Sequence, residues 1–480
     1  MSLSRRIAAN TFLQVIARSL GIVFGVIAFS MMTRYLGKEE FGAFTTITSF
    51  LLFFGFLADL GLYIVTIQLL SEQNQDPQKN FSNLFAYRFI TTTVLISLAP
   101  LISLVFPYPA AIKVGIALTA FSYWCSSFIQ FFTALFQTHI RMEIPSIADI
   151  ASKVLMIGIL VLTIRFDWNL EGVLWSLILN NILQLAILVW ASRSYVRLSF
   201  RFDWTIWKNI FSRSWPIALS IMLNIIYLKA DIIILSLYRD QSEVGIYGAA
   251  YRVIEVLIAL PFLFIGLTLS SFARSWSTGN RETFARYYQK SFDFLVMCAL
   301  PLIVGAYFLG PKGMAFLSGE AFEQSGNILK ILIIAASTVF LSALYGNLIN
   351  IIGKQRTMLW GYLATAVVGL IGYLLFIPRY GMWAAGWITV ITELLILIIA
   401  CAIVSHATKI IPRFSNTLKV VGACCAMGLV FFATPSLHVI PRSLIGAAAY
   451  GIALFITGAV SKEMLLSAIP RLSRNSENTL

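Results

Sequence analysis

Residues Ile7–Met32 read IAANTFLQVIARSLGIVFGVIAFSMM, and this stretch decides the class of fold. It is long enough to cross a bilayer as a helix, which takes about 20 apolar residues. Arg5 and Arg6 precede it, as basic residues precede the apolar part of a signal peptide. However, it carries Arg18, and no small-x-small cleavage site precedes the next apolar stretch. We therefore interpret it as an uncleaved first membrane span.

The whole chain has the same apolar character. Of its 480 residues 59% are hydrophobic and 12% are charged, and the mean hydropathy is +0.84. Soluble globular chains contain about 25% charged residues. The composition disfavours cytosolic enzymes, secreted disulfide scaffolds and nucleic-acid-binding modules. The five cysteines lie in apolar runs without a CxxC pair and the three histidines are scattered, so we expect no disulfide, metal site or cofactor.

Fourteen apolar segments follow one another, and none alternates in the way of a β-barrel strand. We predict an all-α integral membrane protein with helices at 7–33, 41–68, 82–106, 110–136, 145–166, 171–191, 213–238, 246–272, 288–309, 327–351, 357–377, 382–404, 417–434 and 442–461. Little of the chain is left for loops, so a large soluble domain does not fit.

The net charge of +14 is explained by topology rather than by nucleic acid, because cytoplasmic loops of membrane proteins retain Lys and Arg. Most Lys and Arg residues fall on the side that holds the N-terminus, so we predict a multi-pass protein of the inner (plasma) membrane with both termini cytoplasmic. The segment from Arg193 to Trp215 interleaves basic and aromatic residues, which suits a helix on the inner leaflet. A linker anchored by snorkelling side chains explains it equally well.

A motif of the form Tyr-x4-Glu-x-Gly-x-aromatic occurs twice, at 35–44 and 238–247, an offset of 203 residues. Each copy follows the first helix of a six-helix block. Internal repeats are how many transporters build two lobes around a central site. We predict an N-terminal lobe (1–191), an interfacial linker (192–212), a C-terminal lobe (213–404), two added helices (405–461) and a cytoplasmic tail (462–480), with the lobes related as a parallel repeat.

Ionisable side chains inside spans cost about 2.5–3.5 kcal/mol by insertion scales, so each needs a partner or a role. Arg18 has no acid within four residues on its own helix, and Asp59 in the next span lies at a depth where the two could pair. Glu393 is also unpaired locally, which makes it a candidate for proton or cation coupling. Structural pairs that neutralise one another are the alternative for Asp149 with Lys153 and for Arg252 with Glu255. Lys229 and Asp231 lie at a depth where they could meet the second of these pairs.

Three stretches resemble bacterial polysaccharide-biosynthesis flippases, the lipid-linked oligosaccharide exporters of the multidrug/oligosaccharidyl-lipid/polysaccharide superfamily. They are Thr33–Phe44, Gly353–Arg356 and Pro378–Gly386, the last similar to the family's Pro-x-x-Gly-x-x-Gly-Ala pattern but with Ala384 at the second glycine.

The resemblance implies two six-helix bundles that open alternately to each side of the membrane. It also implies that cations of spans 1 and 8, here Arg18 and Arg252, face a central cavity. A sodium ion, if one is coupled, would use Asp231 together with Thr389 or Glu393. A proton is the other possible coupling ion.

On this basis we expect a monomeric flippase for polyprenyl-diphosphate-linked oligosaccharide, in contact with membrane lipids and other polysaccharide-assembly proteins. The phosphates need cations, because diphosphate and sugar cannot cross hydrocarbon unaided. A cation-coupled drug or metabolite antiporter, a membrane glycan polymerase or ligase, and a structural scaffold are the alternatives. The expected substrate-binding residues are Arg18, Lys153, Lys229 and Arg252, and their expected charge partners are Asp59, Asp149, Asp231 and Glu255.

Overall fold

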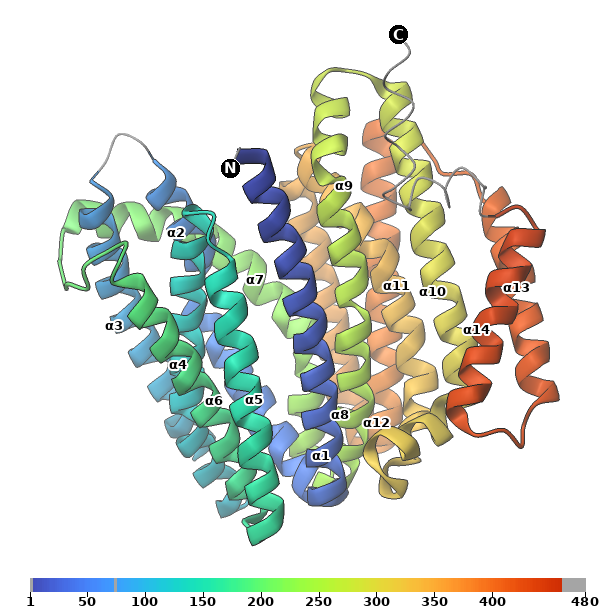
Figure 1. Cartoon of the computed structure of the whole chain (residues 1–480), viewed down its shortest axis with the longest axis horizontal. Helices are drawn as coiled ribbons and strands as arrows, with labels where there is room; N and C mark the ends of the chain where they lie inside the picture. Colours follow the sequence, from blue (N-terminus) through green and yellow to red (C-terminus); the bar gives the residue numbers. More distant parts are fainter. Residues whose placement is uncertain (1–2, 73–75, 460–480) are drawn as a thin grey trace. The chain divides into compact units, whose positions relative to one another are not determined.

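The computed structural model describes residues 3–72 and 76–459, without the side chains of residues 3–16, 18, 219–221, 223–228 and 267. This part of the chain is helical and contains no strand (Figure 1). The helices are α1 (Leu3–Asp59), α2 (Leu62–Ser71), α3 (Pro77–Ser103), α4 (Ala110–Thr138), α5 (Glu143–Phe166), α6 (Asn169–Ser192), α7 (Trp204–Tyr238), α8 (Gln241–Leu257), α9 (Ala259–Ser277), α10 (Arg281–Ser318), the 3-10 turn η1 (Glu320–Phe322), α11 (Ser325–Ile351), α12 (Gln355–Thr408), α13 (Ser415–Ala433) and α14 (Val439–Ile456).

Eleven helical stretches of the described residues are long and apolar enough to cross a membrane. Two of them, Ser19–Ser71 and Gln355–Thr408, have 53 and 54 residues. At about 1.5 Å per residue each would be more than twice as long as a hydrocarbon core of about 30 Å. Each is interrupted by a glycine with positive φ, Gly37 (φ 66°) and Gly381 (φ 56°), a conformation that costs glycine little. Each stretch therefore supplies two of the predicted spans, and the all-helical membrane fold is confirmed.

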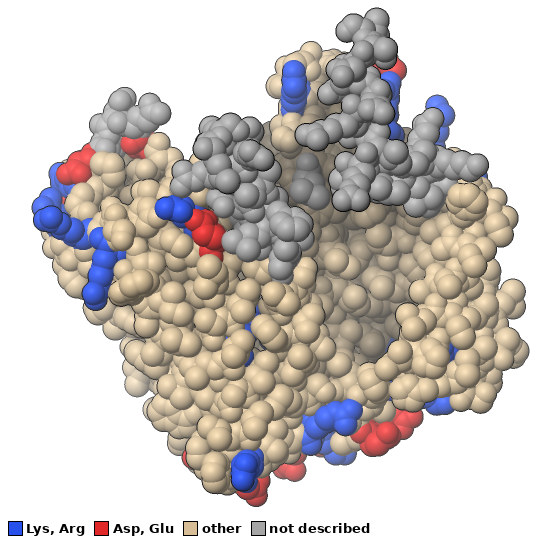
Figure 2. All heavy atoms as spheres, in the orientation of Figure 1, with Lys and Arg blue, Asp and Glu red and all other residues tan. Residues whose placement is uncertain are grey.

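The charged side chains on the surface lie mainly at the ends of the helices. On the face drawn in Figure 2, Lys, Arg, Asp and Glu gather at the two ends and the surface between them is almost free of charge. An apolar band of this kind matches a bilayer core, because exposed charge is costly there. The chain is thus a multi-pass membrane protein.

The two copies of the repeated motif contact each other. A Cβ on Gly42 would collide with the carbonyl oxygen of Gln241, and a Cβ on Gly245 would collide with the carbonyl oxygen of Lys38. Gln241 and Gly245 lie 203 residues after Lys38 and Gly42, the offset of the repeat. The contact between α1 and α8 is therefore reciprocal, as expected of two related elements that cross at a local two-fold axis. Only glycine allows backbones to approach this closely.

The segment from 193 to 215, for which the sequence left an interfacial helix and an anchored linker open, is helical only in its second part. Residues 196–203 are not helical, and α7 begins at Trp204. The Asp203 carboxylate caps α7 by accepting hydrogen bonds from the backbone N–H groups of Thr205 and Ile206. Figure 1 shows the first turns of α7 crossing the neighbouring helices rather than running along them.

The chain forms two compact units by internal contacts. The first contains Met1–Ala249, Leu317–Phe322 and Tyr362–Ile388, and the second contains the remainder. The predicted lobes are defined by the repeat rather than by these contacts, and their boundaries stay a prediction. The predicted tail (462–480) lies outside the described residues.

Candidate functional site

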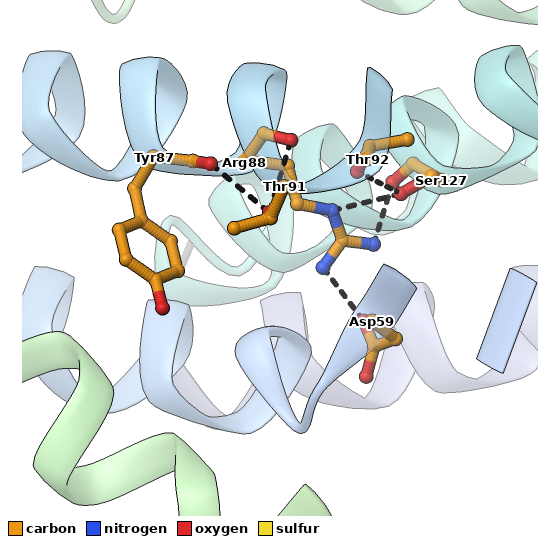
Figure 3. A network of polar contacts seen from close by, with 6 residues as sticks. All are labelled: Asp59, Tyr87, Arg88, Thr91, Thr92 and Ser127. Carbon is orange, nitrogen blue, oxygen red and sulfur yellow. Dashed lines mark hydrogen bonds and ion pairs between the residues drawn. The ribbon is translucent and has the colours of Figure 1, made fainter. Parts of the chain in front are cut away.

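A deeply buried ion pair joins Asp59 of α1 to Arg88 of α3 (Figure 3). The Arg88 side chain is 1% exposed, and its Nη1 lies 2.6 Å from Asp59 Oδ1. Arg88 also donates from Nε to the Ser127 hydroxyl and from Nη2 to the Ser127 carbonyl, each at 2.9 Å. The Ser127 hydroxyl lies 3.0 Å from that of Thr92. The network therefore ties α1, α3 and α4 together.

Local backbone geometry explains why a carboxylate lies here. Asp59 is the last residue of α1, and Leu60 (φ 46°) and Gly61 (φ 72°) break the helix before α2 begins. A Cβ on Gly61 would lie 2.6 Å from the Ile217 side chain of α7, so glycine is required by space as well as by φ. Helix C-termini disfavour negative charge, and the Arg88 guanidinium offsets that cost.

Arg88 is not among the site residues expected from the sequence. Arg88 lies within α3 and forms the ion pair with Asp59. The partner expected for Asp59 was Arg18. Arg18 belongs to α1, but its side chain lies outside the described part. The missed signal was the position of Arg88 inside an apolar run.

Lys153 and Asp149 form the predicted pair one turn apart on α5. Lys153 Nζ lies 2.9 Å from Asp149 Oδ2, and the two side chains are 27% and 37% exposed. Lys153 also donates to the Gly21 carbonyl of α1 at 3.3 Å. A Cβ on Gly21 would lie 2.9 Å from the ammonium, so the glycine makes room for it. This contact brings Lys153 to within one helical turn of Arg18 along α1.

The α7 candidates differ in burial. Asp231 is fully buried and accepts hydrogen bonds from the Tyr247 hydroxyl (2.6 Å) and from the Ile232 N–H (2.8 Å). Tyr247 is the aromatic residue that ends the second copy of the repeated motif. Lys229 is half-buried. Asp231 thus links the repeat to the interior of the first unit.

The second unit holds the other candidates. Arg252 Nη1 lies 2.8 Å from Glu255 Oε2 on α8, which is the predicted pair, and the Arg252 side chain is 60% exposed. Glu393 on α12 is 3% exposed, and no described residue forms an ion pair or hydrogen bond with it. Thr389, one turn earlier on α12, is also buried. Asp231 belongs to the first unit, and Thr389 and Glu393 belong to the second.

These groups differ in what they can do chemically. The Arg88 guanidinium is enclosed and has three donors in use, so it is suited to hold helices together. Lys153 and Arg252 each have one acidic partner and remain partly exposed, so an incoming anion could replace or share that partner. Glu393 is a buried acid that could take up a proton or a cation.

The chain was compared with known proteins. A family model described as "Polysaccharide biosynthesis protein" matches residues 31–327. A Shigella dysenteriae protein named "Putative O-antigen transporter" is 20% identical over 408 residues, which are 81% of this chain and 98% of that protein.

Several solved structures share the fold. "Lipid II flippase MurJ, inward closed conformation" has a TM-score of 0.76 at 15% identity and covers 93% of this chain and 98% of its own. An inward-facing multidrug resistance MATE family transporter of the MOP superfamily has a TM-score of 0.66 at 14% identity and covers 82% of this chain and 99% of its own.

The fold is that of the MurJ flippase and of a MATE transporter, a multi-pass membrane fold. Within that class, the chain belongs to the polysaccharide biosynthesis protein family, whose model matches more than half of it. The named relatives are transporters and flippases rather than enzymes, so the polymerase or ligase alternative is not retained.

Proposed function

We propose that this protein moves a polyprenyl-diphosphate-linked oligosaccharide from the cytoplasmic to the outer leaflet of the inner membrane, for surface polysaccharide synthesis. Membership of the polysaccharide biosynthesis family supports the substrate class, as do relatives named as an O-antigen transporter and a lipid II flippase. The observation that carries the proposal is the position of Lys153, a partly exposed cation within the membrane-spanning part of α5. It contacts the Gly21 carbonyl of α1, one helical turn from Arg18.

The physical problem is the headgroup rather than the tail. A diphosphate and a glycan cannot enter hydrocarbon without losing their hydration, which costs many kcal/mol. Arg offers two parallel N–H donors to phosphate, and Lys offers a compact charge. In the proposed mechanism Arg18, Lys153, Lys229 and Arg252 bind the headgroup in a cavity that opens alternately to each side. Meanwhile the polyprenyl chain stays in lipid.

The test is substitution of single cations. Arg18→Ala, Lys153→Ala and Arg252→Ala should each leave protein levels normal and reduce glycan export at least about tenfold, since one charge-assisted contact is worth about 1.5–3 kcal/mol. Lipid-linked oligosaccharide should accumulate in the cytoplasmic leaflet. Arg286→Ala, which removes an exposed cation with an exposed partner, is the matched control. Normal export in all three variants would overturn the proposal.

We further propose that Glu393 couples transport to a proton gradient. An unpartnered carboxylate in a membrane span is costly unless it binds a proton or a cation. Asp231 already accepts two hydrogen bonds within its own unit, so the sodium alternative with Asp231 and Thr389 has less support. Glu393→Gln, which mimics the protonated state, should make export insensitive to a transmembrane pH gradient. Retained pH sensitivity, or sensitivity to a sodium gradient instead, would contradict this.

A cation-coupled drug antiporter is the second candidate, because the fold is shared with a MATE transporter. The two functions are separated by deletion of the protein. A flippase deletion should accumulate lipid-linked oligosaccharide without changing drug susceptibility. We expect the transporter to act as a monomer beside other polysaccharide-assembly proteins. A monomer would elute at its single-chain mass in detergent.

A further inference from the structure

The segment between α6 and α7 is held against α3. We name residues 193–203 the strap. The Gln78 side chain donates from Nε2 to the Arg197 carbonyl at 2.6 Å, and its Oε1 accepts from the Arg197 N–H at 2.9 Å. The hydroxyls of Ser82 and Ser199 lie 2.7 Å apart. These side-chain bonds replace the backbone ladder that a non-helical segment lacks, so the strap has a defined path along α3.

The strap extends along α3 well past the first turn of that helix. Phe200 contacts Phe85 and Phe89, with ring centroids 5.1 and 5.3 Å away. Phe89 lies twelve residues after Pro77, or about 18 Å along the helix axis. Phe200 nevertheless remains 63% exposed. Phe200 is therefore an exposed ring beside the apolar part of a spanning helix.

Basic side chains of the strap have no acidic partner. Arg193, Arg197 and Arg201 are exposed, and none forms an ion pair in the part of the chain that the structure describes. The acid of the strap, Asp203, is neutralised by Lys79 of α3, whose Nζ lies 2.6 Å away. Figure 2 shows Lys and Arg side chains gathered at the left of the view, over the start of α3 and the strap. The strap therefore presents uncompensated positive charge.

Aromatic side chains accompany these cations. Phe202 and Trp204 are 68% and 69% exposed. Alternating cations and exposed rings suit a surface with anionic groups above an apolar layer, since rings enter the layer while guanidiniums bind phosphate. Each basic residue near an anionic membrane surface contributes about 1 kcal/mol of attraction.

We propose that the strap is a binding site for the phosphate headgroups of anionic phospholipids in the leaflet on its side of the membrane. The three guanidiniums bind the phosphates, and Phe200 and Phe202 contact the upper part of the acyl chains. The site depends on the strap and α3 alone, so it is independent of the proposed transport function.

The experiment measures lipid binding to the purified full-length protein by native mass spectrometry. Phosphatidylglycerol and phosphatidylcholine with the same acyl chains are titrated separately. The variant Arg193→Gln/Arg197→Gln/Arg201→Gln should bind phosphatidylglycerol at least about tenfold more weakly than the unmodified protein, and phosphatidylcholine equally well. Its thermal unfolding should be unchanged, because these side chains are exposed.

The matched control is Arg274→Gln/Lys354→Gln/Arg356→Gln. It removes the same charge from three exposed side chains that likewise have no ion pair in the described structure. Its phosphatidylglycerol affinity should stay within about twofold of the unmodified protein. An equal loss of phosphatidylglycerol affinity in both variants would show that only general charge attraction is at work. Unchanged affinity in the strap variant would show that the strap is not a lipid-binding site. Displacement of phosphatidylglycerol from the strap by a lower concentration of polyprenyl diphosphate would assign the site to the substrate. Each of these three results would overturn the proposal.

Discussion

The Arg88 guanidinium lies inside a membrane-spanning helix, yet three of its donors have partners at 2.6–2.9 Å. Two of these partners are neutral oxygens of Ser127, and the third is the Asp59 carboxylate. A charge in a low-dielectric interior is tolerated when its hydrogen bonds are satisfied and an opposite charge is close. Lys153 is different because it is partly exposed and has one acidic partner. This difference separates a structural cation from a candidate binding cation.

We predict that Arg88→Ala destabilises the protein by about 3–5 kcal/mol, because it leaves Asp59 as an uncompensated buried carboxylate. Thermal unfolding in detergent measures the loss. The double variant Asp59→Leu/Arg88→Met should recover most of it, since apolar residues can replace a buried pair at little cost. Arg286→Ala breaks a pair whose side chains are 63% and 86% exposed and should change stability by less than about 1 kcal/mol. A full loss in the double variant would contradict this account.

The α1–α8 crossing leads to a second prediction, at the scale of elements. Gly42→Ala should destabilise by about 1–3 kcal/mol or more, because its Cβ would displace the backbone of Gln241. Gly245→Ala should act in the same way against Lys38. Gly25→Ala is the control on α1, since nothing lies within 4 Å of its added Cβ, and it should be neutral or slightly stabilising. Equal melting temperatures for Gly42→Ala and Gly25→Ala would exclude the close crossing.

We predict that the pairing of the strap with α3 weakens at low pH. The hydrogen bond from Lys79 holds the pKa of Asp203 below its usual range. The Asp203 contribution to stability is therefore present above about pH 4, the ordinary value, and is lost as pH falls through the lower folded-state pKa. Hydrogen exchange of the backbone N–H groups at the start of α7 should rise relative to other helix ends below pH 4. Asp203→Asn should remove that dependence. A pH response that survives this substitution would need another titrating group.

Sequence reasoning succeeded where one local pattern sets the structure. The all-helical membrane fold follows from apolar length, and the pairs Asp149–Lys153 and Arg252–Glu255 follow from helical spacing. It failed for Asp59 and Arg88, because they are 29 residues apart and meet through the packing of separate helices. It could not choose between a helix and a linker for 193–215, because residues 196–203 are fixed by side chains of α3 rather than by local propensity. The repeated motif predicted two related elements, but only the structure shows that Gly42 and Gly245 touch the opposite copy.

At the scale of the whole molecule, the uneven distribution of Lys and Arg predicts orientation. The strap between α6 and α7 is rich in arginine, whereas the loop between α3 and α4 contains none. Because α3 crosses the membrane once, its two ends face opposite sides, and the strap lies at its first end. The positive-inside rule then predicts that the strap lies in the cytoplasm and the α3–α4 loop outside.

Single cysteines test this orientation. In a variant whose five native cysteines are replaced by alanine, Val105→Cys should react with a membrane-impermeant maleimide on intact cells, because Val105 is 86% exposed in the α3–α4 loop. Ser194→Cys, exposed in the strap, should react only after permeabilisation. The reverse labelling pattern would show that the protein has the opposite orientation, with the arginines of the strap outside the cell. A flippase that loads its substrate in the cytoplasm would then have its cation-rich surface on the wrong side, so labelling constrains both the topology and the proposed direction of transport.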